Sequence, residues 1–93
     1  MEWNKNLSKN LKVLHSETLF RDDNDAPEKI SFHCDFFGEL MIANISKSDI
    51  QRDWNSITGE GDSELWDSFN DQIENKHWDE MKEMFRLHEE NEE

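Results

Sequence analysis

The sequence predicts a small α+β domain in which an antiparallel β-hairpin or three-stranded sheet packs against C-terminal helices. Three observations support this prediction: a length of 93 residues that suits one hydrophobic core, a two-residue hydrophobic period mid-chain, and helical spacing with capping signals after it. We therefore expect a single domain over residues 1–93. Its acidic helical half spans residues 47–90, and an acidic tail over residues 88–93 is expected to fray.

The N-terminal segment carries two competing patterns. Apolar side chains recur at helical spacing and predict a short helix containing Trp3, Leu7, Leu11 and Leu14. β-Branched and aromatic side chains between Val13 and Phe20 predict a strand near residues 12–20, so residues 3–15 stay open between helix and strand. The Asp- and Asn-rich segment 21–27, which ends in the only proline, predicts a loop.

The clearest strand is predicted from Lys29 onward, where apolar and polar residues alternate. The apolar set is Ile30, Phe32, Cys34 and Phe36. This parity places Cys34 on the buried face and turns His33 to the opposite face, where the imidazole cannot reach the thiol. Gly38 can supply the positive φ of a tight turn, and the apolar run 40–45 predicts a second strand that completes a hairpin.

A first helix is predicted directly after this hairpin. Ser46 with Asp49 three residues later forms a variant of the capping box. Apolar side chains follow at helical spacing, namely Ile50, Trp54 and Ile57. The pattern predicts a helix over residues 47–57 that Gly59 terminates.

Two further helices are predicted near the C-terminus. Asp62 or Ser63 can cap the first of them. Its apolar stripe consists of Leu65, Trp66, Phe69 and Ile73. The apolar side chains that follow would lie on an arc rotated by roughly 100°, so one straight helix could not bury both sets on the same face. This predicts a break near Asn75 and a third helix over residues 76 to about 90.

Charge composition narrows the classes of partner. The chain has 23 acidic against 10 basic side chains and a net charge of −13, which repels nucleic acid and anionic membrane surfaces. It lacks an apolar run near ~18 residues and a basic, apolar leader, so neither a membrane span nor a signal peptide is expected. A single cysteine agrees with a reducing compartment. The sequence therefore predicts a soluble cytoplasmic protein, in the host cell's cytoplasm if a phage encodes it.

The sequence carries no motif that indicates catalysis or a bound ligand. The Asp-rich loop places Ala26 and Pro27 where an EF-hand needs a ligand and a glycine. The four histidines show neither an HExxH motif nor paired cysteines, which argues against zinc. Segment 59–62 carries two acids that repel phosphate. So small a chain also lacks material for a substrate cleft, and we expect no enzyme, cofactor or metal.

Acidic side chains follow a regular spacing on the second of these three helices. Intervals of three, four and three residues place four carboxylates on one face within ~15 Å, opposite the apolar stripe: Glu64, Asp67, Asp71 and Glu74. On the third helix Asp79 and Glu83 form a second acidic face, which nearby basic residues soften. Together with Trp78, these side chains are the predicted partner-binding residues.

The first functional hypothesis is a small acidic inhibitor. It would present carboxylates where the basic surface of a nucleic-acid-binding protein or nuclease complex receives phosphates. In size, charge and aromatic content the chain resembles phage-borne DNA mimics that block restriction or CRISPR complexes, and acidic immunity proteins that plug nuclease toxins. The resemblance implies an anti-restriction, anti-CRISPR or immunity role, and it assigns no role to individual residues because no motif accompanies it.

The alternative is a protein–protein interaction or adaptor module that docks through exposed tryptophans, without nucleic-acid mimicry. Helical spacing assigns Trp54 and Trp66 to the core and leaves Trp3 and Trp78 for an interface. A solubilising surface or halophilic adaptation would also produce an acidic face. A homodimer that extends the anionic surface is left open.

Overall fold

The computed structural model describes residues 1–51 and 57–91. Over these residues the chain forms five strands: β1 (Glu2–Ser8), β2 (Leu11–Arg21), β3 (Pro27–Phe36), β4 (Glu39–Ser46) and β5 (Thr58–Glu60). It also forms three helices: α1 (Lys47–Gln51), α2 (Ser63–Lys76) and α3 (Trp78–Asn91).

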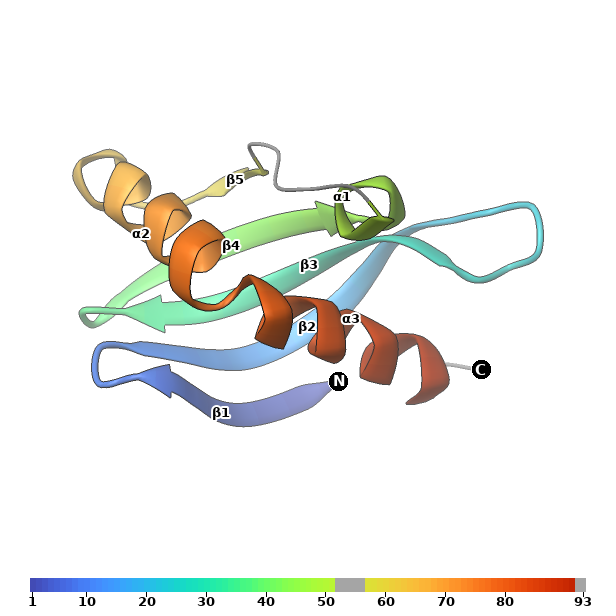
Figure 1. The fold of residues 1–93 in the computed structure, drawn as a ribbon, viewed down its shortest axis with the longest axis horizontal. Coiled ribbons are helices and arrows are strands. Elements are labelled where there is room, and N and C mark those ends of the chain that lie inside the picture. The colour runs from blue at the N-terminus through green and yellow to red at the C-terminus, as the bar shows by residue number, and fades with distance from the viewer. Residues whose placement is uncertain (52–56, 92–93) are drawn as a thin grey trace.

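The sheet is an antiparallel meander in which spatial order equals chain order, β1-β2-β3-β4-β5. A tight turn joins β3 to β4, with Phe37 and Gly38 at φ values of 53° and 82°. Helices α2 and α3 lie across one face of the sheet (Figure 1). The fold is the predicted single α+β domain, and its sheet is larger than the hairpin or three strands expected.

The core lies between this face of the sheet and the two helices. The alternating side chains of β3 are fully buried, as predicted: Ile30, Phe32, Cys34 and Phe36. Phe69 and Ile73 of α2 and Phe85 of α3 belong to the same apolar cluster. Burial raises the pKa of the Cys34 thiol to about 12, so the thiol stays protonated and unreactive at neutral pH.

The short helix predicted near the N-terminus is wrong, because this segment forms the strand β1. Residues 2–8 pair with β2 in an antiparallel ladder, and Asn4 has a φ of 53°, which interrupts any right-handed helix. The apolar spacing of Trp3 and Leu7 instead reflects their packing against the core from a strand. Local periodicity is misleading here because the strand state of this segment depends on its pairing with β2. The strand predicted near 12–20 is confirmed as β2.

The loop predicted over residues 21–27 is confirmed between the end of β2 and the start of β3. The Asp22 carboxylate accepts hydrogen bonds from the backbone N–H groups of Asn24 at 2.9 Å and Ala26 at 3.0 Å. Its second oxygen lies 3.1 Å from Lys47 Nζ. These contacts lower the pKa of Asp22, the Ala26 bond most, and fasten the loop to the start of α1.

The helix predicted over residues 47–57 is confirmed at its start. α1 covers its first five residues. The predicted capping box is confirmed, since Ser46 N donates to Asp49 Oδ2 at 3.0 Å and Asp49 N donates to Ser46 Oγ at 3.2 Å. Residues 52–56, with Trp54, lie outside the described residues.

β5 is a strand that the sequence does not predict. Ile57 precedes it in a non-helical conformation, so the predicted helix does not reach that residue. Gly59 lies opposite Ala43 of β4, and a Cβ atom at Gly59 would be 1.8 Å from the backbone oxygen of Ile42. Gly59 therefore allows β5 to approach β4 closely, and this packing role replaces the predicted role as a helix stop.

The predicted break between two C-terminal helices is confirmed close to Asn75. α2 ends at Lys76, and His77 leaves the helical region with φ −126° and ψ 9°. α3 continues to Asn91, so residues 88–91 are helical where the sequence predicts a frayed tail. Among the described helices, none is long and apolar enough to cross a membrane.

Candidate partner-binding surface

α2 is oriented by its cap and its apolar stripe. The Asp62 carboxylate accepts from the backbone N–H groups of Glu64 and Leu65, which fixes the first turn. Phe69 and Ile73 are fully buried in the core. This orientation turns four carboxylates away from the core, and we call them the α2 acidic face: Glu64, Asp67, Asp71 and Glu74. The first three are exposed and Glu74 is half-buried.

The carboxylates of the α2 acidic face form no ion pair in the described part of the chain. Asp71 accepts a hydrogen bond from Asn75 Nδ2 at 2.8 Å. The sequence explains this isolation, because residues 53–75 contain no Lys, Arg or His. The same stretch contains seven acids: Asp53, Glu60, Asp62, Glu64, Asp67, Asp71 and Glu74. The predicted row is therefore present and uncompensated.

Four of the five acids of α3 form ion pairs with Lys or Arg side chains: Asp79, Glu83, Glu89 and Glu90. Asp79 pairs with Lys82 at 3.2 Å, and Glu83 forms a close ion pair with Arg86. Arg86 also binds Glu90 at 2.6 Å and holds the pKa of Glu83 below its ordinary value, mainly by hydrogen bonding. The two predicted α3 site residues are therefore paired with cations, which distinguishes them from the carboxylates of the α2 acidic face.

The tryptophans expected at an interface are half-buried in the structure. Trp3 and Trp78 both pack against the core. The Trp3 indole N–H donates to Ser16 Oγ at 2.7 Å. Trp66, expected in the core, is also half-buried against it. Trp3 and Trp78 are therefore only partly exposed, because β1 and the start of α3 fold onto the core, and their role at an interface stays a prediction.

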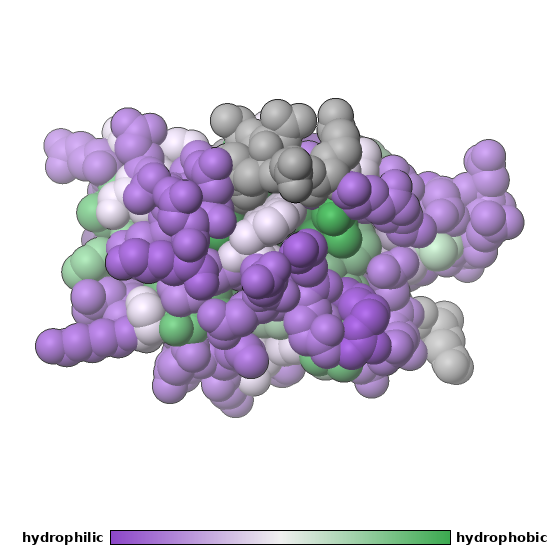
Figure 2. Space-filling view, viewed as in Figure 1, coloured by the Kyte–Doolittle hydropathy of each residue, from purple (hydrophilic) through white to green (hydrophobic). Residues whose placement is uncertain are grey.

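Large apolar side chains other than tryptophan are exposed instead. Phe37 and Leu40 flank the β3–β4 turn with 54% and 56% exposure, and Phe20 near the end of β2 is 62% exposed. Over α2 and α3 the surface is mostly hydrophilic (Figure 2). An apolar docking site on the described residues would therefore lie at the sheet ends.

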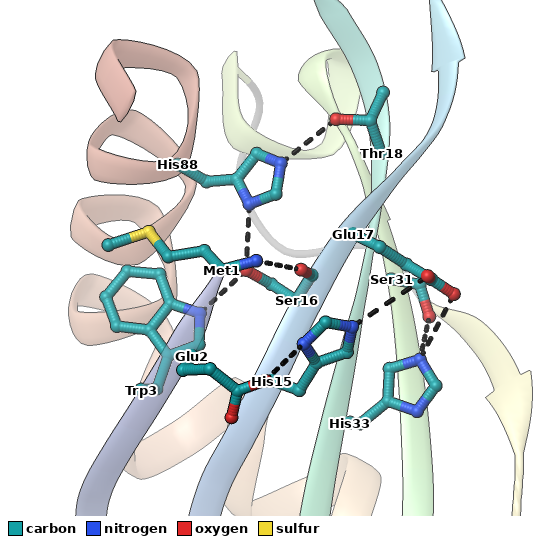
Figure 3. A network of polar contacts seen from close by, with 10 residues as sticks. All are labelled: Met1, Glu2, Trp3, His15, Ser16, Glu17, Thr18, Ser31, His33 and His88. Carbon is teal, nitrogen blue, oxygen red and sulfur yellow. Dashed lines mark hydrogen bonds and ion pairs between the residues drawn. The ribbon is translucent and has the colours of Figure 1, made fainter. Parts of the chain in front are cut away.

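A buried polar network links three elements on the inner side of β2 (Figure 3). Ser16 Oγ lies 2.8 Å from His88 Nδ1, and Thr18 Oγ1 lies 2.9 Å from His88 Nε2. Ser16 also receives the Trp3 indole bond, so one hydroxyl joins β1, β2 and α3. Ser16 and His88 are 0% and 2% exposed, and both border a hollow of about 290 Å³ that Met1 and Asn91 also line. The network therefore fastens the end of α3 to the sheet.

A second polar cluster lies on the outer side of the sheet, where His15 and His33 face each other with ring centroids 5.3 Å apart (Figure 3). Glu17 lies 3.8 Å from His15 Nε2 and 3.5 Å from His33 Nε2, and Glu2 lies 3.3 Å from His15 Nδ1. Sequence reasoning misses this cluster because only the β2–β3 register brings the two histidines together.

The described residues include no group of three His, Cys, Asp or Glu side chains placed to hold a metal ion. Comparison with known proteins gives no match, whether with protein-family models, with curated proteins or with solved structures.

Proposed function

We propose that this protein is a non-enzymatic inhibitor that occupies a basic, nucleic-acid-binding surface of a partner protein, with the α2 acidic face in place of phosphates. The observation that supports this proposal is the contrast between two adjacent helices. The carboxylates of the α2 acidic face lack cationic partners among the described residues, whereas Asp79, Glu83 and Glu90 of α3 are paired. An acidic surface that served solubility alone would not need this division.

The spacing and rigidity of the α2 acidic face suit phosphate mimicry. Successive carboxylates lie ~5 Å apart along the helix and phosphates ~3.4 Å apart along one DNA strand, so the two rows of charge can overlap although they are not in register. Phe69 and Ile73 anchor the helix in the core, so the carboxylates are held in place before binding. The face also accepts like-charge pairs that each destabilise a helix by about 0.2–0.5 kcal/mol.

The net charge of −13 selects the class of partner. A field of this sign attracts basic surfaces and accelerates encounter with them, and it repels nucleic acid itself. Nuclease toxins, restriction complexes and CRISPR complexes all carry such basic surfaces. Association should slow steeply as salt rises, because the Debye length falls to ~8 Å at physiological ionic strength.

Affinity capture from the source cell, followed by competition, tests this function. The unaltered chain and the triple variant Asp67→Asn, Asp71→Asn, Glu74→Gln serve as baits, and captured proteins are identified by mass spectrometry. We expect the unaltered chain to recover a nucleic-acid-binding protein, to displace nucleic acid from it, and to lose it when the triple variant is the bait.

Two matched variants make this test specific. Asp23→Asn, Asp25→Asn, Glu39→Gln changes the net charge by the same amount at exposed acids outside α2 and should retain the partner. Phe37→Ser, Leu40→Ser removes the exposed apolar pair and should also retain the partner. If this apolar variant loses the partner while the α2 triple variant keeps it, the protein is a docking module and our proposal is wrong.

A further inference from the structure

A hollow of about 290 Å³ lies beside the α2 acidic face, where β5 leads into α2. Gly59, Glu60, Gly61, Ser63 and Trp66 line it. Its volume is at the lower limit of small-molecule pockets, which suits one inserted side chain better than a cofactor.

Two glycines shape this hollow. A Cβ atom at Gly59 would lie 2.8 Å from Trp66 Cη2, and one at Gly61 would lie 2.4 Å from Met41 Sδ. The backbone of segment 59–61 therefore packs closely against residues 41–42 of β4. Because Gly59 and Gly61 carry no side chains, the hollow beside Trp66 stays open. Trp66 is supported from within by Phe69, with ring centroids 5.6 Å apart, so the indole forms a fixed wall.

The charge around this aromatic wall is negative. Glu60, Asp62 and Glu64 are exposed around the hollow, and the described residues between 57 and 75 include no Lys or Arg. The N-terminus of α2 would itself favour an anion. Asp62 already fills that role by accepting from the N–H groups of Glu64 and Leu65. The remaining carboxylates and the indole together favour a cation.

We propose that the hollow binds an arginine side chain of the partner, with the guanidinium against Trp66 and hydrogen-bonded to Glu60. This inference rests on the proposed function, because it names the group that the basic partner inserts next to the α2 acidic face. A planar guanidinium stacks on an indole and donates two parallel N–H bonds to one carboxylate, whereas an ammonium group attracts both as a point charge without a planar face or a fixed pair of donors. The hollow thus selects arginine over lysine at equal charge.

Titration of the intact chain with hexa-arginine and hexa-lysine peptides tests this selection. Both peptides carry the same charge, so the α2 acidic face alone should distinguish them weakly. We expect hexa-arginine to bind about tenfold more tightly, measured by isothermal titration calorimetry. Glu60→Gln and Trp66→Leu should each reduce the ratio to about two. Glu39→Gln, at an exposed acid on β4, should leave the ratio unchanged.

Amide NMR of the unaltered chain gives a second measurement that does not depend on the folding of Trp66→Leu. Hexa-arginine should shift the signals of Gly59, Gly61 and the Trp66 indole N–H more strongly than hexa-lysine does. Shifts confined to residues 67–74, or equal shifts by both peptides, would overturn the arginine assignment.

The two proposals fail in distinguishable ways. If the peptides bind equally, and Asp67→Asn, Asp71→Asn, Glu74→Gln abolishes the binding of both, the hollow is not an arginine site and the acidic inhibitor function stands. If neither peptide binds in a salt-dependent way, the α2 acidic face does not attract cations. Both proposals are then wrong.

Discussion

α2 and α3 are alike inside the molecule and different outside it. Each has 14 residues and places apolar side chains in the same core. α3 pairs Asp79, Glu83 and Glu90 with Lys82 and Arg86, whereas the α2 acidic face forms no ion pair with a described residue. The comparison teaches that acid content alone says little about binding. The placement of the few basic residues determines which acids remain free to attract a partner.

The helices also differ in how they are fastened beyond the core. The last turns of α3 are tied to the sheet through His88 and to α1 through Glu89, which lies 3.6 Å from Lys47 Nζ. α2 presents its outer face free of such ties in the described structure. We therefore regard α3 as a structural helix and α2 as the presenting helix.

The largest expected change is in the free energy of unfolding, and it tests whether the two helices contribute equally to the core. Phe69→Ala in α2 and Phe85→Ala in α3 should each lower the free energy of unfolding by about 3–5 kcal/mol, because both rings are fully buried. Urea unfolding followed by circular dichroism measures both values. A loss below about 1 kcal/mol for either variant would show that its helix is not part of the same core.

The second prediction tests the difference in charge between the helices. Asp67→Asn, Asp71→Asn, Glu74→Gln should weaken binding to the captured partner about a hundredfold, or about 2.7 kcal/mol, without lowering the melting temperature. The matched α3 variant carries Asp79→Asn, Glu83→Gln and Glu90→Gln. It should change affinity less than about threefold, because those acids are already paired. Equal losses for the two triple variants would remove the functional distinction between α2 and α3.

A smaller effect is expected for the network that fastens α3. Ser16→Ala removes the shared partner of the Trp3 indole N–H and His88 Nδ1, and it should lower the free energy of unfolding by about 1–3 kcal/mol. Ser68→Ala, at an exposed site on α2, should change it by less than about 0.5 kcal/mol. Urea unfolding measures both variants, and similar values for the two would show that the network does not fasten α3.

The smallest effect concerns pH. Arg86 lowers the pKa of Glu83 in the folded state, so this pair adds stability above the ordinary glutamate pKa of about 4.3, and the contribution disappears as pH falls through the lowered value. Arg86→Gln should return the pKa of Glu83 towards 4.3 and reduce this acid-dependent loss of stability. Carboxyl ¹³C NMR titration follows Glu83 directly. An unchanged pKa in the variant would show that α3 does not neutralise its own acids.

Features encoded by local spacing could be predicted from the sequence. The alternation at Ile30–Phe36 and the turn at Gly38 define the β3–β4 hairpin, and the 3-4-3 spacing from Glu64 to Glu74 defines the α2 acidic face. Both depend on neighbours within a few residues. The alternation of β3 also predicts the burial of Cys34 correctly.

Features that depend on distant pairing could not be predicted. The strand state of β1 requires β2, and the position of β5 requires the close approach of Gly59 to Ile42. An irregularity in the β2–β3 register between Val13 and His15 shifts the side-chain parity of β2. The hollow beside Trp66 likewise depends on the way in which β5 meets α2.

The link between His88 and Ser16 also has a consequence for how the chain folds. Every strand pairs with the strand next to it in the sequence, and short connections join β1 to β2, β2 to β3 and β3 to β4, so this part of the sheet can grow hairpin by hairpin. The His88–Ser16 contact instead closes a separation of 72 residues, which costs more loop-closure entropy than any hairpin turn. We therefore expect the docking of α3 to complete folding. During synthesis on a ribosome, Ser16 of β2 could contact His88 of α3 only after nearly the whole sequence had emerged.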